Sequence, residues 1–372
     1  MSVELDLVLV GFGNVARRFV TLLDEQRSVL EEAHNLRTRV VAMTTRRHGS
    51  AVDPHGLDAA ALADVVRRGG TIEGRRGGHV GHSTGFLRRL LATDRFARLA
   101  HAGRLVVIET TTLDIESGRP AIDHVRAALA GGAHVVTANK GPAAFAYRSL
   151  AAAAARAGRR FLFEGAVMDG IPVFNLVRET LPTVRVTGFR GVVNATTNYI
   201  LTSIERGQTF GEALAAMQAA GVAEADPSLD VKGWDAAAKA SVLANVLLDA
   251  RMTPRRIERE GIDEGTGLRV AAARARGRRV KLVVRGERDA RGVRARVRLE
   301  DLPSGDLLAE LEGEQNALVL NTDLLGEIAI VQRGSGLTQT AYALLSDLVA
   351  VSRHPAGRPQ RSRPRARRGR SQ

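Results

Sequence analysis

Residues 4–16 read ELDLVLVGFGNVA, and this stretch predicts how the first half of the chain folds. The apolar run at 4–10 is typical of a buried β-strand, and the GFGNVA that follows fits the pattern G-x-G-x-x-G/A. Glycines at these positions permit a tight turn and let the pyrophosphate of a dinucleotide approach the N-terminus of the next helix. A purely structural glycine turn is the alternative. We expect a dinucleotide cofactor to contact Gly11, Gly13, Asn14 and Val15.

Four more apolar runs follow within about 165 residues, and helical segments rich in Ala, Arg and Leu separate them. Strands that alternate with helices are typical of a parallel, doubly wound sheet, so the predicted fold class is α/β. We assign residues 1–165 to this dinucleotide-binding domain. The further strands are expected at 38–45, 104–112, 133–140 and 159–167.

Beyond Pro172 the predicted strands and helices are grouped, which is typical of an α+β domain. We expect this second domain at 166–335 and a closing helix at 336–352. Residues 353–372 are rich in Arg and Pro without apolar periodicity, which predicts a disordered tail. The second domain should contain strands near 184–194, 280–286, 293–299, 317–320 and 327–332, and helices near 196–206, 209–220 and 234–249.

The composition excludes several classes of protein. The chain has no cysteine, which removes disulfides, thiolate metal sites and Cys nucleophiles. Its net charge is +14, but eight arginines lie at 353–372, which leaves +6 on the first 352 residues. We therefore do not expect a nucleic acid partner, apart from nonspecific contacts of the tail. No apolar run approaches 18 residues, so we expect no membrane span, and the absence of cysteine favours a cytoplasmic protein.

The end of the second strand indicates which nicotinamide cofactor binds. An acidic residue there binds the ribose 2′-hydroxyl of NAD, whereas arginine suits the 2′-phosphate of NADP. The chain has Arg46 and Arg47 at this point and no acid before Asp53. These arginines favour NADP over NAD, although a chain with 50 arginines places them in many loops.

Only four of the 54 basic residues are lysines. Arginine stays charged at any working pH, whereas lysine can donate a proton, so the few lysines are candidates for catalysis. Lys140 ends a predicted parallel strand, where such folds bind ligands. Lys239 follows Asp235 by four residues on one helix face, either as a surface ion pair or as a catalytic pair. We interpret Lys232 as an ordinary surface lysine.

Glu224, Asp226 and Asp230 make the loop before this helix rich in carboxylates. Such a loop could hold the ammonium group of a substrate while Lys239 faces a polarised oxygen. Calcium is the competing ligand, but the spacing of the acids lacks the EF-hand pattern.

Six segments occur in the order seen in homoserine dehydrogenases, and the chain resembles that family from about residue 4 to residue 351. The family reduces L-aspartate 4-semialdehyde to L-homoserine with NADH or NADPH, in the biosynthesis of threonine and methionine. The resemblance implies a Rossmann domain, a substrate and dimerisation domain, and a homodimer. It also implies a short form without a C-terminal regulatory domain. The segments are GFGNVA, TANKGP, EGAVMDGIP, NATTNYIL, AEADPSLDVKGWDAAAK and GSGLTQTA.

The resemblance also implies roles for single residues. Lys140 and Lys239 are similar to two family lysines around the reacting group, and Asp235 to the carboxylate beside them. Glu224 resembles the residue that holds the substrate's amino group, with Asp230 and Thr196 in the same pocket. We expect further cofactor contacts from Thr110, Thr111, Gly334, Gly336 and Thr340. A monovalent cation such as sodium, held largely by backbone oxygens, would lie at Glu164, Val167, Asp169 and Ile171.

Two rival functions remain open at this point. One is another reductase of amino-acid metabolism on the same scaffold, which would not require the acidic loop followed by Asp235 and Lys239. The other is a non-catalytic protein that senses a nucleotide, or binds nucleic acid through its arginine-rich tail.

Overall fold

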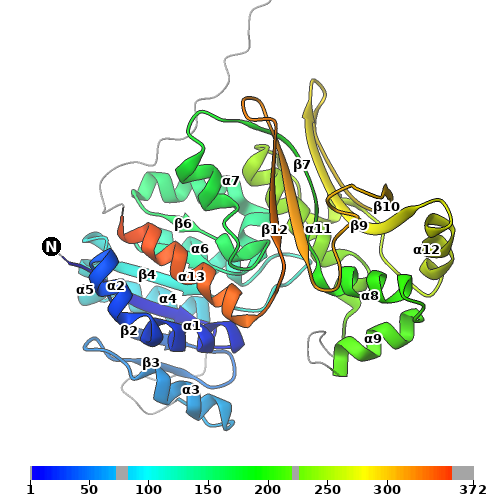
Figure 1. The fold of residues 1–372 in the computed structure, drawn as a ribbon. Coiled ribbons are helices and arrows are strands. Elements are labelled where there is room, and N and C mark those ends of the chain that lie inside the picture. Colours follow the sequence, from blue (N-terminus) through cyan, green and yellow to red (C-terminus); the bar gives the residue numbers. More distant parts are fainter. Residues whose placement is uncertain (1, 73–82, 220–225, 354–372) are drawn as a thin grey trace, which may run out of the picture.

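The computed structural model describes residues 2–72, 83–219 and 226–353. It contains two six-stranded sheets that stand next to each other, with helices around and between them (Figure 1). Except for Arg353, the predicted disordered tail lies outside the described residues, and so does Glu224. Within the described residues, no helix is both long and apolar enough to cross a membrane.

The first sheet has the strand order β3-β2-β1-β4-β5-β6, which confirms the predicted α/β fold with a parallel sheet. All neighbours are parallel except β3, a short edge strand that pairs antiparallel with β2 and was not predicted. Strands β2 and β3 are added on one side of β1, and β4, β5 and β6 are then added on its other side. The carboxyl ends of β1 and β4 therefore border the crevice where such sheets bind ligands. The strands are β1 (Val3–Val10), β2 (Leu36–Thr44), β3 (Ser50–Val52), β4 (Leu105–Glu109), β5 (His134–Thr137) and β6 (Phe161–Leu162).

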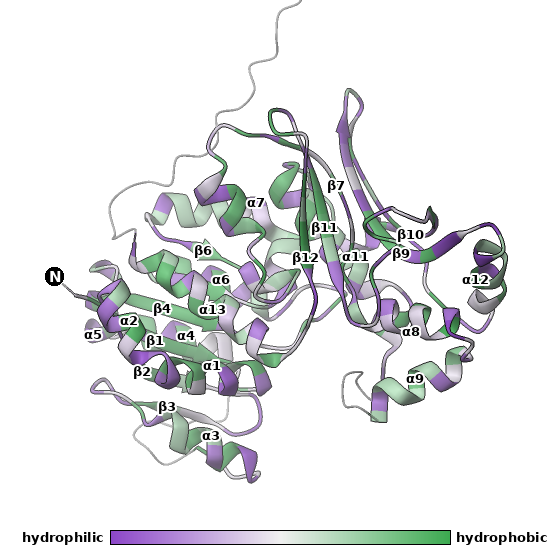
Figure 2. Ribbon diagram, viewed as in Figure 1, coloured by the Kyte–Doolittle hydropathy of each residue, from purple (hydrophilic) through white to green (hydrophobic). Residues whose placement is uncertain are grey.

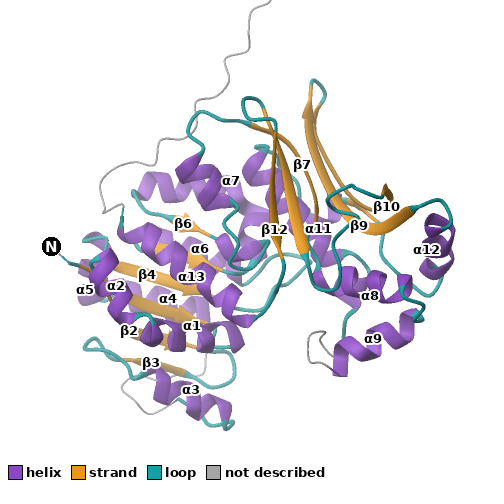
Figure 3. Ribbon diagram, in the orientation of Figure 1, coloured by secondary structure: helices purple, strands orange, loops and turns teal. Residues whose placement is uncertain are grey.

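Helices cover both faces of this sheet (Figure 3). The central strands β1 and β4 are hydrophobic (Figure 2) because they are buried on both faces. Helix α1 turns Ala16, Phe19 and Leu23 inward, and Leu344 and Leu348 of α13 join the same core. The helices are α1 (Asn14–Glu25), α2 (Arg27–His34), α3 (Ala59–Arg67), α4 (Ser83–Leu91), α5 (Asp94–His101), α6 (Ala121–Ala130), α7 (Lys140–Ala157) and α13 (Leu337–Ser352).

The second sheet has the order β12-β11-β7-β9-β10-β8 and is antiparallel except for the pair β8 and β10. Helices α8 to α12 accompany it, and α11 packs against α7 between the two sheets. The strands are β7 (Val186–Val192), β8 (Glu258–Arg259), β9 (Arg278–Asp289), β10 (Gly292–Pro303), β11 (Asn316–Thr322) and β12 (Glu327–Gln332). The helices are α8 (Ala195–Glu205), α9 (Phe210–Ala219), α10 (Ser228–Val231), α11 (Trp234–Leu247) and α12 (Thr266–Arg274).

The strand predicted at 159–167 is wrong in its length. Strand β6 ends at Leu162, and a 3₁₀ turn occupies Glu164–Ala166. The Glu164 carboxylate accepts hydrogen bonds from the backbone N–H groups of residues 173–175, which turns the chain back on itself. An apolar run cannot reveal this, because the partners of the carboxylate follow about one strand length later in the sequence.

Candidate active site

Asp235 bridges the two predicted catalytic lysines. Its Oδ1 lies 3.2 Å from Lys140 Nζ, and its Oδ2 lies 3.0 Å from Lys239 Nζ. The side chains of Asp235 and Lys239 are each only 15% exposed, so the pair is not the exposed surface pair that helix spacing alone would suggest. One carboxylate thus holds two ammonium groups from different helices.

The local sequence explains why these helices begin where they do. Lys140 is the first residue of α7, and Asn139 caps this helix by accepting a hydrogen bond from the Gly141 amide at 2.8 Å. Helix α11 follows Gly233, which has a φ of 74°. A Cβ there would lie 2.4 Å from the Glu260 carbonyl oxygen, so glycine allows the turn that aims Asp235 toward α7.

Asn194 joins the acidic loop to this cluster, and the sequence analysis did not identify it. Its Nδ2 donates to Asp230 Oδ1 at 2.7 Å and to Asp235 Oδ2 at 2.9 Å. Its Oδ1 caps α8 by accepting from the Thr197 amide, which fixes the direction of the side-chain amide. The predicted substrate residue Thr196 is buried in the first turn of the same helix. An Asn directly before a helix was the available sequence signal.

The charges at the site oppose the cost of burial. The negative charge of Asp235 raises the pKa of Lys140. Burial alone would raise the pKa of Asp235, but the charges of Lys140 and Lys239 outweigh it and hold that pKa well below its usual range. Burial and the charge of Asp235 raise the pKa of Asp230. Asp235 is therefore the permanent anion of the site, and Lys140 stays protonated.

Lys239 has a donor to spare. Its Nζ donates to the Val193 carbonyl oxygen at 2.6 Å and lies beside Asp235. An ammonium group has three N–H bonds, and within the described chain these two contacts use two of them. The third N–H is available to the oxygen of a substrate.

The glycine turn lies against the end of β4. Gly11 has a φ of 90°, and a Cβ there would lie 2.9 Å from Thr110 C and Thr111 N. Glycine therefore brings the predicted cofactor residues of β1 and β4 together. Gly13 caps α1, and a Cβ there would meet no atom within 4 Å, so the space before this helix N-terminus is open. Asn14 and Val15 form the first turn of α1. This arrangement fits the pyrophosphate of a dinucleotide.

Arg46 and Arg47 are exposed on a tight turn directly after β2. The Thr45 amide donates to the Gly49 carbonyl, and Thr45 Oγ1 accepts from the His48 amide. These two hydrogen bonds close the turn that contains both arginines. Within the described residues, neither arginine has a carboxylate within ion-pair distance. Both guanidinium groups are therefore free to meet an anionic ligand.

The turn before α13 connects the two predicted sites. Gly334 and Gly336 precede this helix, and Thr340 Oγ1 donates to Asp169 Oδ1 at 3.0 Å. The charge of Asp169 in turn contributes to the raised pKa of Lys140. A predicted cofactor residue and a predicted cation residue thus meet near Lys140.

The side chains at the predicted cation site already have partners. Three backbone amides bind the Glu164 carboxylate, and Gln332 and Thr340 bind that of Asp169. The described residues contain no group of three or more acidic or histidine side chains that could hold a metal ion. A cation near Val167 and Ile171 would therefore depend on backbone oxygens, which are the hard ligands that sodium prefers.

Comparisons with known proteins agree along the chain. Residues 172–349 match the family described as homoserine dehydrogenase, and residues 11–164 match the homoserine dehydrogenase NAD binding domain. An NAD(+)-dependent homoserine dehydrogenase from Pseudomonas canavaninivorans is 36% identical over 94% of this chain and 96% of its own length. A homoserine dehydrogenase from Methanocaldococcus jannaschii is 32% identical over 93% and 98%. The solved homoserine dehydrogenase of Thiobacillus denitrificans superposes with a TM-score of 0.76 at 30% identity, covering 94% of this chain and 73% of that one.

Proposed function

Because the chain belongs to the homoserine dehydrogenase family, we propose that Lys239, Asp235 and Lys140 carry out its proton and charge chemistry. The enzyme is an NAD(P)-dependent oxidoreductase that interconverts L-aspartate 4-semialdehyde and L-homoserine. The observation that carries the proposed assignment is the Asp235 carboxylate between two lysines, next to the carboxyl end of a parallel sheet.

Lys239 is the proposed proton donor in the direction of reduction. A bound nicotinamide cofactor would supply the hydride, and negative charge would then develop on the aldehyde oxygen of the substrate. The free N–H of Lys239 would bind that oxygen, stabilise its charge and give up a proton. Asp235 and the Val193 carbonyl oxygen hold the ammonium group in one direction while this happens.

Lys140 provides fixed positive charge beside the same carboxylate. Its raised pKa keeps it protonated, so it contributes attraction and orientation rather than a transferable proton. Asp230, held by Asn194, and Thr196 would line the substrate side of the pocket together with Glu224. Carboxylates in this position suit the substrate's amino group.

An assay of homoserine oxidation with NAD and NADP, side by side, tests the proposed function. We expect turnover with at least one cofactor, read as absorbance of the reduced nicotinamide. Absence of turnover with both cofactors would contradict the assignment. Glycerol or serine in place of homoserine serves as the substrate control and should give no signal.

We propose NADP as the preferred cofactor, because Arg46 and Arg47 are exposed after β2, where an acid would select NAD, and have no carboxylate partner among the described residues. The NAD(+)-dependent relative makes NAD the alternative. Replacing both arginines by alanine should raise the KM for NADP about tenfold or more and change that for NAD less than twofold. The matched control removes two exposed arginines of α7, Arg148 and Arg156, and should leave both KM values unchanged. Equal losses for both cofactors would contradict the proposal.

We also propose a sodium ion near the 3₁₀ turn at Glu164–Ala166. Two buried carboxylates meet there, since the Glu164 amide donates to Asp347 Oδ2 at 2.8 Å. Burial and the charge of Glu164 raise the pKa of Asp347 to about 7. A cation would offset this negative charge. The melting temperature should then rise with sodium chloride more than with choline chloride at equal ionic strength, and equal rises would contradict the site.

A homodimer is the proposed assembly, formed through the second domain at 166–335, while residues 1–165 bind the cofactor. Exposed apolar side chains on the β11–β12 hairpin support it, since Leu324 is 65%, Leu325 54% and Val331 41% exposed. Light scattering should give about twice the chain mass of 39.8 kDa. Replacing Val331 by glutamate should favour the monomer, whereas a monomeric wild type would contradict the proposal.

A further inference from the structure

Glu109 is a fully buried carboxylate at the carboxyl end of β4, and the reaction described above gives it no role. Its Oε1 accepts hydrogen bonds from the backbone amide of Thr111, at 3.1 Å, and from the hydroxyl of the same residue. Its Oε2 accepts one from Thr137 Oγ1 at 2.9 Å. The Nδ1 of His124 lies 3.3 Å from Oε1. A buried carboxylate with these donors is fixed, because moving it would leave several of them unsatisfied.

These bonds continue to the first lysine of the site. Thr137 Oγ1 accepts from the Asn139 amide at 2.9 Å, and Asn139 Nδ2 donates to the Thr111 carbonyl oxygen at 2.8 Å. Asn139 also caps α7, whose first residue is Lys140. A closed ring of hydrogen bonds therefore runs from Glu109 through the ends of β4 and β5 to the start of the lysine's helix. The ring therefore fixes the backbone position of Lys140, whose side chain contacts Asp235.

The same ring lies against the cofactor turn. Thr111 N is one of the atoms that a Cβ on Gly11 would meet at 2.9 Å, so the position of Thr111 limits where the glycine turn can lie. The two hydrogen bonds from Thr111 to Glu109 set that position. One carboxylate thus borders both the cofactor turn and the lysine.

His124 supports Glu109 from α6. Its Nδ1 faces Oε1 of Glu109, which can only accept, and its Nε2 lies 2.6 Å from Ser83 Oγ. Serine, histidine and glutamate follow the order of a hydrolase triad. The His124 side chain is fully buried, however, and two threonines share the carboxylate. This geometry suits holding a position rather than activating a nucleophile.

We propose that Glu109 is a positioning residue of the reductase site, which holds Thr111 against the cofactor turn and Lys140 against Asp235. The kinetic part of this inference rests on the proposed function, whereas its cofactor-binding part does not. Asp6 offers a matched control on the same sheet. It is also a buried carboxylate, but it pairs with Leu105 at the start of β4, whereas Glu109 pairs with Val10 at the end of β1. The two carboxylates lie at opposite ends of the region in which β1 and β4 pair.

The first experiment compares Glu109→Gln with Asp6→Asn. Both replace a buried carboxylate by an amide, so both should lower the melting temperature. Only Glu109→Gln should lower kcat/KM for homoserine, by about 10- to 100-fold, because it disturbs the donors that the ring satisfies. It should also raise the Kd for NADPH, measured by the fluorescence of the bound nucleotide. An equal loss of kcat/KM in Asp6→Asn, or a loss below twofold in Glu109→Gln, overturns the proposal.

The second experiment needs no change to a carboxylate and covers the case in which Glu109→Gln does not fold. Thr137→Ser keeps the hydroxyl that links Glu109 to Asn139, and Thr137→Val removes it with little change of shape. The valine variant should lose about tenfold in kcat, and the serine variant should stay within twofold of wild type. Equal activity of the two variants would contradict the proposal that the hydrogen bonds through Thr137 position Lys140. If wild type itself shows no turnover, the proposed function fails, and the NADPH affinities alone then decide the inference.

Discussion

Two lysine clusters in this chain differ in burial and in the partners of the ammonium group: Lys140 and Lys239 are half-buried, whereas Lys281 is fully buried. At the active site Asp235 faces Lys140 and Lys239, and both contacts are charge pairs. In the second sheet Lys281 is fully buried, and its Nζ donates to neutral oxygens, Asn198 Oδ1 at 3.1 Å and the Leu311 carbonyl at 2.6 Å. A carboxylate keeps a buried lysine charged, whereas neutral acceptors leave it close to losing its proton.

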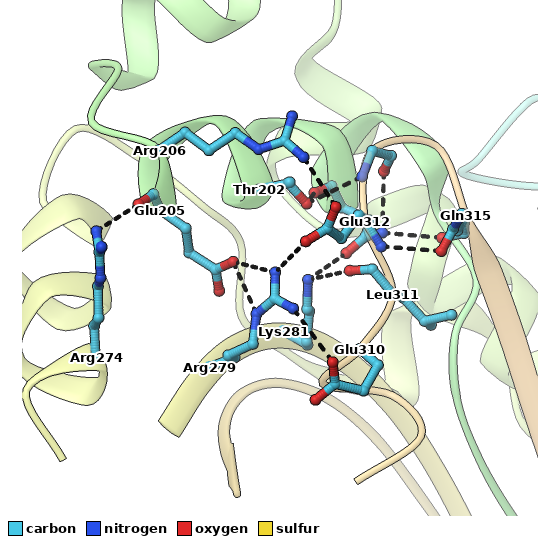
Figure 4. A network of polar contacts seen from close by, with 12 residues as sticks. Thr202, Glu205, Arg206, Arg274, Arg279, Lys281, Glu310, Leu311, Glu312 and Gln315 are labelled. Carbon is cyan, nitrogen blue, oxygen red and sulfur yellow. Dashed lines mark hydrogen bonds and ion pairs between the residues drawn. The ribbon is translucent and has the colours of Figure 1, made fainter. Parts of the chain in front are cut away.

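Near Lys281, the carboxylates pair with Arg279 rather than with the lysine. Figure 4 shows Arg279 between Glu205 and Glu312, and its Nε and Nη2 donate to Glu205 Oε2 at 3.0 and 2.7 Å. The guanidinium group takes the carboxylates, because its planar fork matches them. Burial consequently lowers the pKa of Lys281 to about 8. The two clusters therefore differ both in burial and in partner chemistry, with charged partners at the proposed catalytic lysines and neutral oxygens at Lys281.

The largest expected effect comes from removing the ammonium group of Lys239. Lys239→Met should lower kcat by about 10³-fold, because it would remove both the proposed proton donor and the positive charge proposed to lie beside the aldehyde oxygen. The Kd for NADPH should stay within about threefold of wild type, since the glycine turn lies between β1 and α1, whereas Lys239 lies on α11. Steady-state kinetics and nucleotide fluorescence measure the two quantities. The control, Lys281→Met, should keep kcat within about threefold, and a variant at position 239 with near-normal turnover would contradict the assignment.

A smaller loss should follow when the carboxylate between the lysines becomes neutral. Asp235→Asn keeps both ammonium groups but not their orientation, so kcat should fall about 10²-fold. The charge of Asp235 raises the pKa of Lys140, so its removal lowers that pKa. The basic limb of the kcat profile should then move to lower pH. A full pH–rate profile checks this, and an unchanged basic limb in an otherwise impaired variant would argue against the role of Lys140.

The smallest effect on activity, but a clear one on stability, is expected at Lys281. Its pKa is lowered from 10.5 to about 8 on folding, so between these values the unfolded chain binds more protons than the folded one. The stability of wild type relative to Lys281→Met should therefore rise with pH from about 8 to about 10, by up to about 3 kcal/mol. Urea unfolding at several pH values measures the difference. The exposed Lys232→Met serves as control, and a flat difference for Lys281→Met would show that its ammonium group is not desolvated.

The sequence predicted the elements that local rules govern. GFGNVA after an apolar run predicted the first strand, the turn and α1, and the four-residue spacing predicted that Asp235 and Lys239 share a face. The use of rare lysines as a guide was only partly informative, since Lys281 is equally rare but lies in a structural network.

The residues that the sequence analysis did not identify are those whose partners lie far away in the sequence. Asn194 meets Asp230 across 36 residues of chain, and Glu109 meets Thr137 across 28. No periodicity or spacing indicates such pairs, because each forms only when separate elements have packed. The short strand β3 was missed for another reason: its partner β2 is close in sequence, but three residues are too few to show an alternating pattern.

The position of α13 has a consequence for synthesis of the protein. Its Leu344 and Leu348 belong to the same core as Leu7, Leu9 and Phe19, which are made first, and its Thr338 accepts a hydrogen bond from Arg18. While the ribosome is still translating the second sheet, one face of the first sheet lacks the part of its cover that α13 supplies. Contacts this far apart in sequence close slowly, and the waiting surface is apolar. A nascent chain that has emerged only to residue 330 would therefore be a target for chaperones and proteases, and the final turns of α13 would release it.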